Sequence, residues 1–507
     1  LTISRSGQFF EVQSGATLTI MDSNDLSETV TTGDGSPYGN TASLEGDTLT
    51  YYITTSTPDD TGTTETLEQH TVTLSGAILC AEGSEQAIRV QAGGTLELQS
   101  GVLRNDGSKH IVYVDGGTLD VNGGYIVGGG SDGTPGGGIY VNGGEVNISG
   151  GVVAANRGNS GGGIYVNSGT LNISGGAVTG NEVINGHADN GGGIYVESGK
   201  LNLSGGYVTN NSKSCTCVED TCPNKNDTNN KHGGGGIALA NGSTMNMTGG
   251  YVTGNFSSLA GGGIYAGFWD NKVTFTMSGG TIAANCAEYG EGGGLRIAGG
   301  TKGVIQAAEQ KKVYITHNQT LTTDDWGGGG IFVQEKGILT VLDALITDNT
   351  AGGFGGGVGA CPTGETLIVN KDGAAIYGNS ADGRQMSAGG NGKYYDRDLA
   401  LNNPVFMSNG FKDYFCVREK GKNDYISLVT GLMAGGGAAN WKGSCDNQPV
   451  TIGKTGYAAA KYLFGLEARP DASAIDRAVD AAKVIITGNS SGVHGGGIMT
   501  NGGLILG

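Results

Sequence analysis

The sequence is poor in proline, in positive charge and in long apolar runs. Only 8 of its 507 residues are proline, and its 100 glycines follow no strict three-residue period, so a collagen helix is excluded. No run approaches the ~20 apolar residues of a transmembrane helix, so we expect no direct membrane insertion. The 29 basic residues are outnumbered by 47 acidic ones, which argues against nucleic acid and anionic membranes as partners.

Glycine is the abundant residue, at 100 of 507 positions. Hydrophobic residues still make up 37% of the chain, and valine and isoleucine alternate with polar residues in short runs. Such a chain has a core to bury, so simple disorder is not expected. The length suits either several ordinary domains or one elongated stack of repeats.

A glycine-rich hexapeptide recurs along the chain. Residues 136–141 read Gly-Gly-Gly-Ile-Tyr-Val and return as 161–166 and 191–196, and 25 residues separate Ile139 from Ile164. Longer steps carry polar insertions. Looser copies begin at Gly234, Gly261, Gly292, Gly328, Gly355 and Gly495.

Each repeat holds three short apolar runs, which in the first copy are 139–141, 146–148 and 152–153. Glycine pairs separate them, and runs this short with period-two alternation are typical of strands. The pattern predicts an all-β chain, a parallel β-helix with three strands and about 25 residues per rung. Loop insertions and one mixed lobe containing a short helix interrupt it.

An asparagine follows an inward valine or isoleucine by three positions in nearly every repeat. We expect the apolar side chain to point inward, and the asparagine to turn the corner because it tolerates left-handed backbone. Stacked side-chain amides would then hydrogen-bond from rung to rung. The pairs are Val102/Asn105, Val153/Asn156, Val178/Asn181, Val208/Asn211, Val252/Asn255, Ile282/Asn285, Ile315/Asn318, Ile346/Asn349, Ile376/Asn379 and Ile486/Asn489.

Four regions follow from these patterns. Residues 1–75 form N-terminal rungs with an insertion that either protrudes as a hairpin or caps the open end. Residues 76–380 form the parallel β-helix with a cysteine-rich loop at 212–232. Residues 381–484 form an inserted or lateral lobe, in which Asp471 caps a helix, and 485–507 form a final rung.

The glycine and asparagine motifs, with the ending Val-Ile-Ile-Thr-Gly-Asn at 484–489, resemble a known group of proteins. These are β-helix surface proteins of gut-type Gram-positive bacteria and the related polymorphic outer-membrane repeats. The resemblance covers residues 70–380 and 484–507. It implies a right-handed coil and a secreted, cell-surface location, with wall anchoring through a part of the chain not present here. The chain is then a monomeric module of a longer protein.

The cysteines are candidates for disulfides. Three lie in the 212–232 loop, and Cys286 follows a corner asparagine two rungs later, so it could complete two bridges. Unpaired thiols, or a metal site with His232, are the alternatives; the spacing is not a standard zinc pattern, and we predict no bound metal or cofactor. The candidates are Cys215, Cys217, Cys222, Cys286, Cys416 and Cys445.

A row of tyrosines is the main candidate for ligand binding. Each lies between two inward residues, so we expect an outward aromatic strip that suits sugars or protein partners. The alternative is a ladder that stabilises the sheet by cross-strand packing. Trp326 and Trp441, the latter in the lobe, are further ligand-binding candidates. The row comprises Tyr113, Tyr140, Tyr165, Tyr195 and Tyr265.

Three functions remain open. The first is an adhesin that binds a host glycan, glycoprotein or immunoglobulin. The second is a β-helix glycoside hydrolase, for which Asp324 and Asp325 are the first candidates as catalytic carboxylates and Asp343 and Asp348 the next. The third is a passive stalk. We expect the isolated His232, His317 and His494 to be turn or surface residues.

Overall fold

The structure, a computed structural model, is all-β apart from one helix, α3 (Ala472–Ala481), in the part of the chain that it describes. The chain divides into two compact units. Unit 1 comprises Leu1–Thr57, Glu65–Thr274 and Ala284–Cys286, and unit 2 comprises Pro58–Thr64, Phe275–Ala283 and Ala287–Gly507. The structure describes all residues except 1, 7, 23–25, 60, 76–77, 83–85, 107, 185–190, 215–232, 269–271, 323–326, 361–364, 369–372, 382–412, 418–427, 431–439, 446–447, 453–456 and 460–462.

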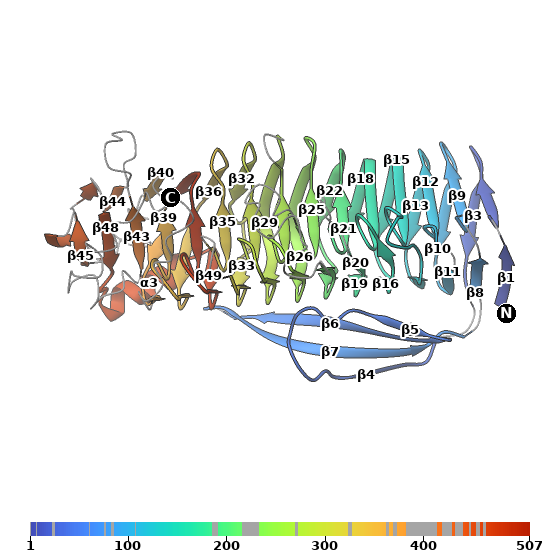
Figure 1. Ribbon diagram of the computed structural model, residues 1–507, viewed down its shortest axis with the longest axis horizontal. Helices are drawn as coiled ribbons and strands as arrows, with labels where there is room; N and C mark the ends of the chain where they lie inside the picture. Colours follow the sequence, from blue (N-terminus) through green and yellow to red (C-terminus); the bar gives the residue numbers. More distant parts are fainter. Residues whose placement is uncertain are drawn as a thin grey trace, which may run out of the picture. The chain divides into compact units, whose positions relative to one another are not determined.

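In unit 1, strands at equivalent positions of successive repeats pair in parallel (Figure 1). Ile139 pairs with Ile164, as the repeated hexapeptide predicts. We number the main strands of each repeat first, second and third in chain order. The first strands of successive repeats are β2 (Phe10–Val12), β9 (Ile88–Gln91), β12 (Val112–Asp115), β15 (Ile139–Ile148), β18 (Ile164–Ile173), β21 (Ile194–Val196), β25 (Ile237–Leu239) and β28 (Ile264–Ala266).

The second strands continue this order, and β15 and β18 run through both the first and the second position. The other second strands are β3 (Thr17–Ile20), β10 (Thr95–Leu98), β13 (Thr118–Val121), β22 (Lys200–Leu203) and β26 (Thr244–Thr253). Third strands are β1 (Thr2–Ser6), β8 (Ile78–Glu82), β11 (Val102–Asn105), β14 (Tyr125–Val127), β16 (Val152–Ala154), β19 (Ala177–Thr179) and β23 (Tyr207–Thr209), followed by the end of β26.

A fourth, short strand follows the asparagine and was not predicted. In unit 1 it occurs as β17 (Arg157–Gly158), β20 (Glu182–Ile184), β24 (Ser212–Ser214) and β27 (Phe256–Ser257), which pair in parallel. These segments carry no alternating apolar run, so periodicity could not reveal them. The prediction of an all-β chain with parallel strands is confirmed, and the stacking is compatible with a parallel β-helix.

The interior of each unit is a dry apolar stack. Ile139, Val141 and Val146 are fully buried, while the residues between them face outward. Each such side chain contributes roughly 1.5–3 kcal/mol when it leaves water. A shift of β15 by one residue would expose these side chains, so their burial sets the register between repeats.

The asparagines form a buried ladder, but they do not turn the corner. Asn181 Nδ2 donates to Asn211 Oδ1 at 3.0 Å and to the Val153 carbonyl at 2.9 Å, as the stacking hypothesis predicts. From Asn156 onward the left-handed residue is the one before the asparagine, for example Gly180 at φ 60° and Ala284 at φ 52°. The predicted corner was thus wrong by one residue, because the asparagine side chain is committed to inward hydrogen bonds.

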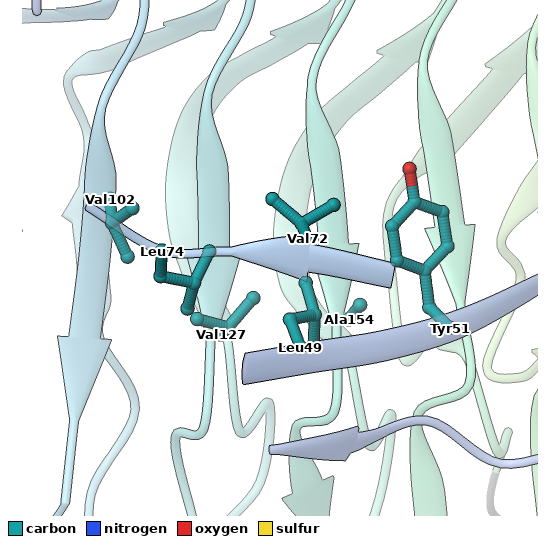
Figure 2. Close-up of a cluster of buried hydrophobic side chains, with 7 residues drawn as sticks. All are labelled: Leu49, Tyr51, Val72, Leu74, Val102, Val127 and Ala154. Atoms are coloured by element: carbon teal, nitrogen blue, oxygen red, sulfur yellow. The ribbon is translucent and has the colours of Figure 1, made fainter. Parts of the chain in front are cut away.

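A four-stranded antiparallel sheet lies against the third strands of unit 1. Its strands are β4 (Glu28–Thr32), β5 (Ser43–Glu45), β6 (Thr48–Pro58) and β7 (Thr63–Thr73). Figure 2 shows its buried side chains packed onto three successive repeats, in a cluster of Leu49, Tyr51, Val72, Leu74, Val102, Val127 and Ala154. The segment for which a hairpin or an end cap was expected therefore covers the side of these repeats.

In unit 2, the last repeat of the sequence is an interior layer of the stack. β49 (Val484–Thr487) lies between β33 (Val313–Thr316) and β37 (Ala344–Thr347) and pairs in parallel with both. In Figure 1 the chain end accordingly lies beside β36 and β40. The first strands run, in spatial order, β31 (Leu295–Ile297), β35 (Ile331–Val333), β51 (Ile498–Thr500), β39 (Val358–Ala360) and β43 (Tyr414–Val417).

The other positions of unit 2 keep the same order. Second strands run β32 (Lys302–Ile305), β36 (Ile338–Val341), β52 (Gly503–Leu506), β40 (Glu365–Ile368) and β44 (Leu428–Thr430). Third strands end with β41 (Ala375–Ile376), next to β37. The short strands run β34 (Gln319–Thr320), β50 (Ser490–Ser491), β38 (Thr350–Ala351) and β42 (Ser380–Ala381).

The described part of the predicted 381–484 lobe joins this stack. β43 continues the parallel order and also pairs antiparallel with β48 (Leu463–Glu467), which pairs with β45 (Trp441–Cys445). β45 also pairs with β46 (Gln448–Ile452), and β44 with β47 (Tyr457–Ala459). The predicted helix is α3, and the Asp471 side chain accepts a hydrogen bond from Ala474 N at 2.8 Å as its N-cap.

Candidate functional site

The tyrosine row exists in unit 1. Tyr113, Tyr140, Tyr165 and Tyr195 occupy the same position in β12, β15, β18 and β21 and are paired in register. Their ring centroids are 5.3, 5.1 and 5.4 Å apart in that order. Because the rings lie against one another, their faces are largely occupied within the row, and their edges and hydroxyls are left for other contacts.

The far end of the row is covered. Ala238 stands at the tyrosine position of β25, and Phe268 lies 6.5 Å from Tyr195 and 5.0 Å from Tyr265. Tyr195 is 4% exposed and Tyr265 is 1% exposed. These two predicted ligand-binding residues point outward from the strands, but neither lies on the surface.

An ionic cluster lies at the other end. The Arg89 guanidinium lies 5.6 Å from the Tyr113 ring centroid and pairs with the Asp115 carboxylate at 2.5 Å. Arg89 holds the pKa of Asp115 below its usual value, chiefly through this hydrogen bond. Glu11 lies 3.8 Å from the same guanidinium. The cluster is partly exposed, so its contribution to stability is small.

His110 also lies against the row, with its ring 5.4 Å from Tyr113 and 5.3 Å from Tyr140. Burial, and then the charge of Lys109, lowers the His110 pKa to about 4. The imidazole is therefore neutral at neutral pH and packs as a flat ring. Sequence reasoning missed it because it precedes the strand and breaks the tyrosine spacing.

A polar row runs beside the tyrosines, two residues further along each strand. Asn142 Nδ2 donates to Asp115 Oδ1 at 3.2 Å and to Tyr113 Oη at 3.3 Å. Asn167 Nδ2 donates to Asn142 Oδ1 at 2.9 Å, and Glu197, the next member of the row, accepts from Asn241, which lies just beyond β25. Period-two alternation could have predicted this row, since residues i and i+2 share one face of a strand.

The exposed part of this surface combines hydroxyl, amide and carboxylate groups. Tyr113, Tyr140 and Tyr165 are half-buried, as are Asn142 and Asn167. Burial, with the charge of Glu197, raises the Tyr165 pKa to about 12, so its hydroxyl remains a hydrogen-bond donor. We call these five residues the tyrosine–asparagine strip. It is chemically suited to a ligand rich in hydroxyl groups.

The other sequence candidates do not join this strip. Trp441 in unit 2 is fully buried, so its ring is not on the surface where a ligand was expected. Asp324, Asp325 and Trp326 lie outside the described residues. Asp343 lies 3.7 Å from Lys483 Nζ, and Asp348 has left-handed backbone at φ 54°. In the described part of the chain, no group of three or more His, Cys, Asp or Glu residues could hold a metal ion.

The disulfide hypothesis finds no support. Cys286 is buried, and no disulfide is found in the part of the chain that the structure describes, so the expectation that it completes two bridges stays a prediction without support. Cys286 directly follows the ladder residue Asn285 and belongs to the short strand β30 (Cys286–Ala287), where its side chain is buried. Cys215, Cys217 and Cys222 lie outside the described residues, and the side chains of Cys416 and Cys445 are likewise not described.

The histidines divide between surface and interior. His317 is exposed at a corner with φ 52°, as predicted. His494 lies at a bend of the chain but is only 3% exposed, so of the predicted turn or surface position only the surface one is wrong. Its Nδ1 accepts a hydrogen bond from Phe354 N at 3.0 Å, and its ring stacks on Phe354. His232 lies outside the described residues.

Asp413 takes the place of an asparagine at one end of the unit 2 ladder. Its Oδ1 accepts from Asn379 Nδ2 at 2.9 Å, and its Oδ2 accepts from Ala468 N at 2.7 Å. An asparagine here would turn its NH₂ toward the Ala468 N–H, so the position needs two acceptors. Burial raises the Asp413 pKa to about 6 against the lowering effect of these hydrogen bonds.

We expect Asp413 to make unit 2 more stable as the pH falls. Its folded-state pKa lies above the value of 3.8 expected for the unfolded chain, so the folded state binds the proton more tightly. The gain should reach about 2 kcal/mol between pH 7 and pH 4. Denaturant titrations of the wild type and of Asp413→Asn, compared at each pH, isolate this contribution. A difference between the two that does not change with pH would contradict it.

No helix within the described residues is long and apolar enough to cross a membrane. Comparison with protein-family models, with curated proteins and with solved structures finds no match to this chain.

Proposed function

We propose that this chain is an extracellular binding module that contacts a host glycan through the tyrosine–asparagine strip. The observation that carries the proposal is the strip itself, where two parallel rows of hydrogen-bonding side chains repeat at the strand spacing of about 4.8 Å. A glycan offers many hydroxyls along an extended chain. Such a ligand could bond successive members of both rows without any large rearrangement of the module.

The proposed mode of binding is through hydroxyls and amides. Tyr140 lies between Tyr113 and Tyr165, so a sugar cannot lie flat on its ring face. The Tyr140 and Tyr165 hydroxyls, and the Asn142 and Asn167 amides, remain as donors and acceptors at the edge of the row. Each hydrogen bond to a ligand would add about 0.5–1.5 kcal/mol.

We further propose that the stack is a right-handed parallel β-helix with three main strands per rung. The 25-residue offset between the paired Ile139 and Ile164 supports a rung of about 25 residues. A bacterial cell-surface adhesin, secreted and wall-anchored through another part of a longer chain, is the setting that fits these features. The resemblance of the glycine and asparagine motifs to β-helix surface proteins is the support for this setting.

The test is a glycan array followed by titration of the best ligand. Tyr140→Phe combined with Tyr165→Phe removes two hydroxyls and keeps the rings, so the ladder should survive. We expect binding to weaken about tenfold or more, which corresponds to about 1.4 kcal/mol. Tyr207→Phe is the matched control, because Tyr207 stacks on Tyr251 on the third-strand face instead.

Other outcomes would decide against the proposal. Unchanged binding in the double variant would remove the strip from the interaction. Binding that survives deglycosylation of a host protein would favour a protein ligand such as an immunoglobulin. Turnover of labelled oligosaccharides would favour a glycoside hydrolase, and silence in every assay would favour a passive stalk.

A further inference from the structure

The C-terminal repeat of unit 2 fills a slot between two layers that are consecutive in the sequence. β36 and β37 are consecutive strands joined only by Leu342 and Asp343. The repeat that ends with β36 and the repeat that begins with β37 are nevertheless not neighbours, because one complete layer lies between them. The missing layer is supplied by β49 to β52, about 140 residues later in the chain. In unit 1, by contrast, paired layers follow the order of the sequence.

The slot holds the repeat by the same contacts that join all other layers. Asn489 lies in the ladder between Asn318, which donates to it at 3.0 Å, and Asn349, which accepts from it at 2.8 Å. Val484 N donates to Asp343 O at 3.1 Å, at the point where the chain skips the layer. Nothing in these contacts depends on the segment that links the repeat to β48.

The two layers that flank the slot have matching edges. Thr320 and Ala351 both pair with Ser491, one from each side, and so lie two strand spacings apart. Because the repeats share one pattern, the layers around Thr320 and Ala351 present edges that are complementary to each other. During synthesis these two layers exist before residues 484–507 do, so insertion has to occur late.

The helix that precedes the repeat is mostly exposed, and the firm backbone contacts begin only at Lys483, whose N donates to Asp343 O at 3.0 Å. α3, which precedes β49, buries only Ala474 and Ala478, and Lys483 lies 3.7 Å from Asp343 as a half-exposed ion pair. A repeat that enters late behind this helix meets the same slot in its own chain and in a neighbouring copy. This is the usual geometry of domain swapping, in which identical elements are exchanged.

We propose that the C-terminal repeat, residues 484–507, is exchangeable between copies of this chain, so that the slot of one copy accepts the repeat of a second copy. The partner is thus the same protein, and the contact is an added layer with hydrogen bonds on both sides. The exchange takes place while the slot is open, during folding at high local concentration. It is independent of the ligand proposed for unit 1.

The test uses two full-length copies with different tags. One carries Thr320→Cys and the other carries Ser491→Cys; the wild-type oxygens of these residues are 3.1 Å apart and buried. When the copies are refolded together and oxidised, we expect a mixed dimer linked between positions 320 and 491. Its fraction should rise several-fold with a tenfold increase in protein concentration.

Two controls define the result. Ser490→Cys in the second copy should give little linkage, because position 490 pairs with Gln319 instead. Copies that are refolded separately and then mixed should give little linkage as well, because both sites are buried. The double variant in one chain shows whether the disulfide can close within a single copy.

Linkage within one chain without any linkage between copies, at every concentration, would overturn the proposal. If the disulfide fails to close even within one chain, the proposal is tested instead by capturing mixed-tag dimers after the two copies are refolded together. Mixed dimers that resist dilution and separate only on unfolding support exchange, and monomers alone at all concentrations overturn it.

Discussion

Asn181→Ala is expected to lower the free energy of unfolding of unit 1 by on the order of 4 kcal/mol. The side chain donates to Val153 O and Asn211 Oδ1, and it accepts from Asn156 N at 3.2 Å and from Asn156 Nδ2 at 3.0 Å. All of these groups are buried, so water cannot replace the lost partner. The measurement is equilibrium unfolding in denaturant.

The matched control for this variant is Asn172→Ala. Asn172 also belongs to a ladder of amides, since its Nδ2 donates to Asn147 Oδ1 at 2.8 Å and its Oδ1 accepts from Asn202 at 2.7 Å. It faces solvent on the second strands, so we expect a loss below about 1 kcal/mol. Equal losses in the two variants would show that hydrogen-bond number, and not burial, sets the strength of the ladder.

Unit 2 is expected to lose about 3 kcal/mol of stability through His494 as the pH falls from 7 to 4. Burial lowers the His494 pKa to about 4 from its usual value of 6.5. Between these two values the unfolded chain binds the proton and the folded chain does not, so acid favours unfolding. The neutral Nδ1 is also the acceptor for Phe354 N, and protonation removes that acceptor.

His494→Asn isolates this effect. The asparagine Oδ1 takes the place of Nδ1 and still accepts from Phe354 N, but the side chain does not titrate. The difference in unfolding free energy between wild type and variant, measured from pH 7 to pH 4, should shrink by about 3 kcal/mol. A difference that stays constant would mean that His494 is not neutral inside the folded unit. Because Asp413 acts in the opposite direction, the wild type alone would hide both contributions.

The repeats were predictable because they obey one local rule. Alternation around Ile139, Tyr140 and Val141 forces the two valine and isoleucine positions inward and the tyrosine outward, and a fixed offset brings equivalent residues together. The asparagine ladder followed from the same offset. The corner was misplaced by one residue, because Asn181 uses its side chain inward while Gly180 bends the backbone.

The accessible part of the candidate site was not predictable. Tyr140 and Tyr195 have the same local sequence, Gly-Gly-Gly-Ile-Tyr-Val, yet only Tyr140 remains half-exposed. The difference comes from Phe268, which lies 72 residues beyond the strand of Tyr195 and folds over that end of the row. No pattern within one repeat carries that information.

The sequence by itself determined the repeat, its three main strands, its inward residues and the row of tyrosines, because each of these depends on neighbours within about 25 residues. Only the tertiary structure decided which faces are covered and in which order the layers stack. The physical reason is that the repeats are nearly equivalent. Asn318 bonds Asn489, although Asn349 is the next ladder asparagine along the chain. The two asparagines offer the same amide, so local chemistry does not distinguish the order of the layers, and only the path of the whole chain does.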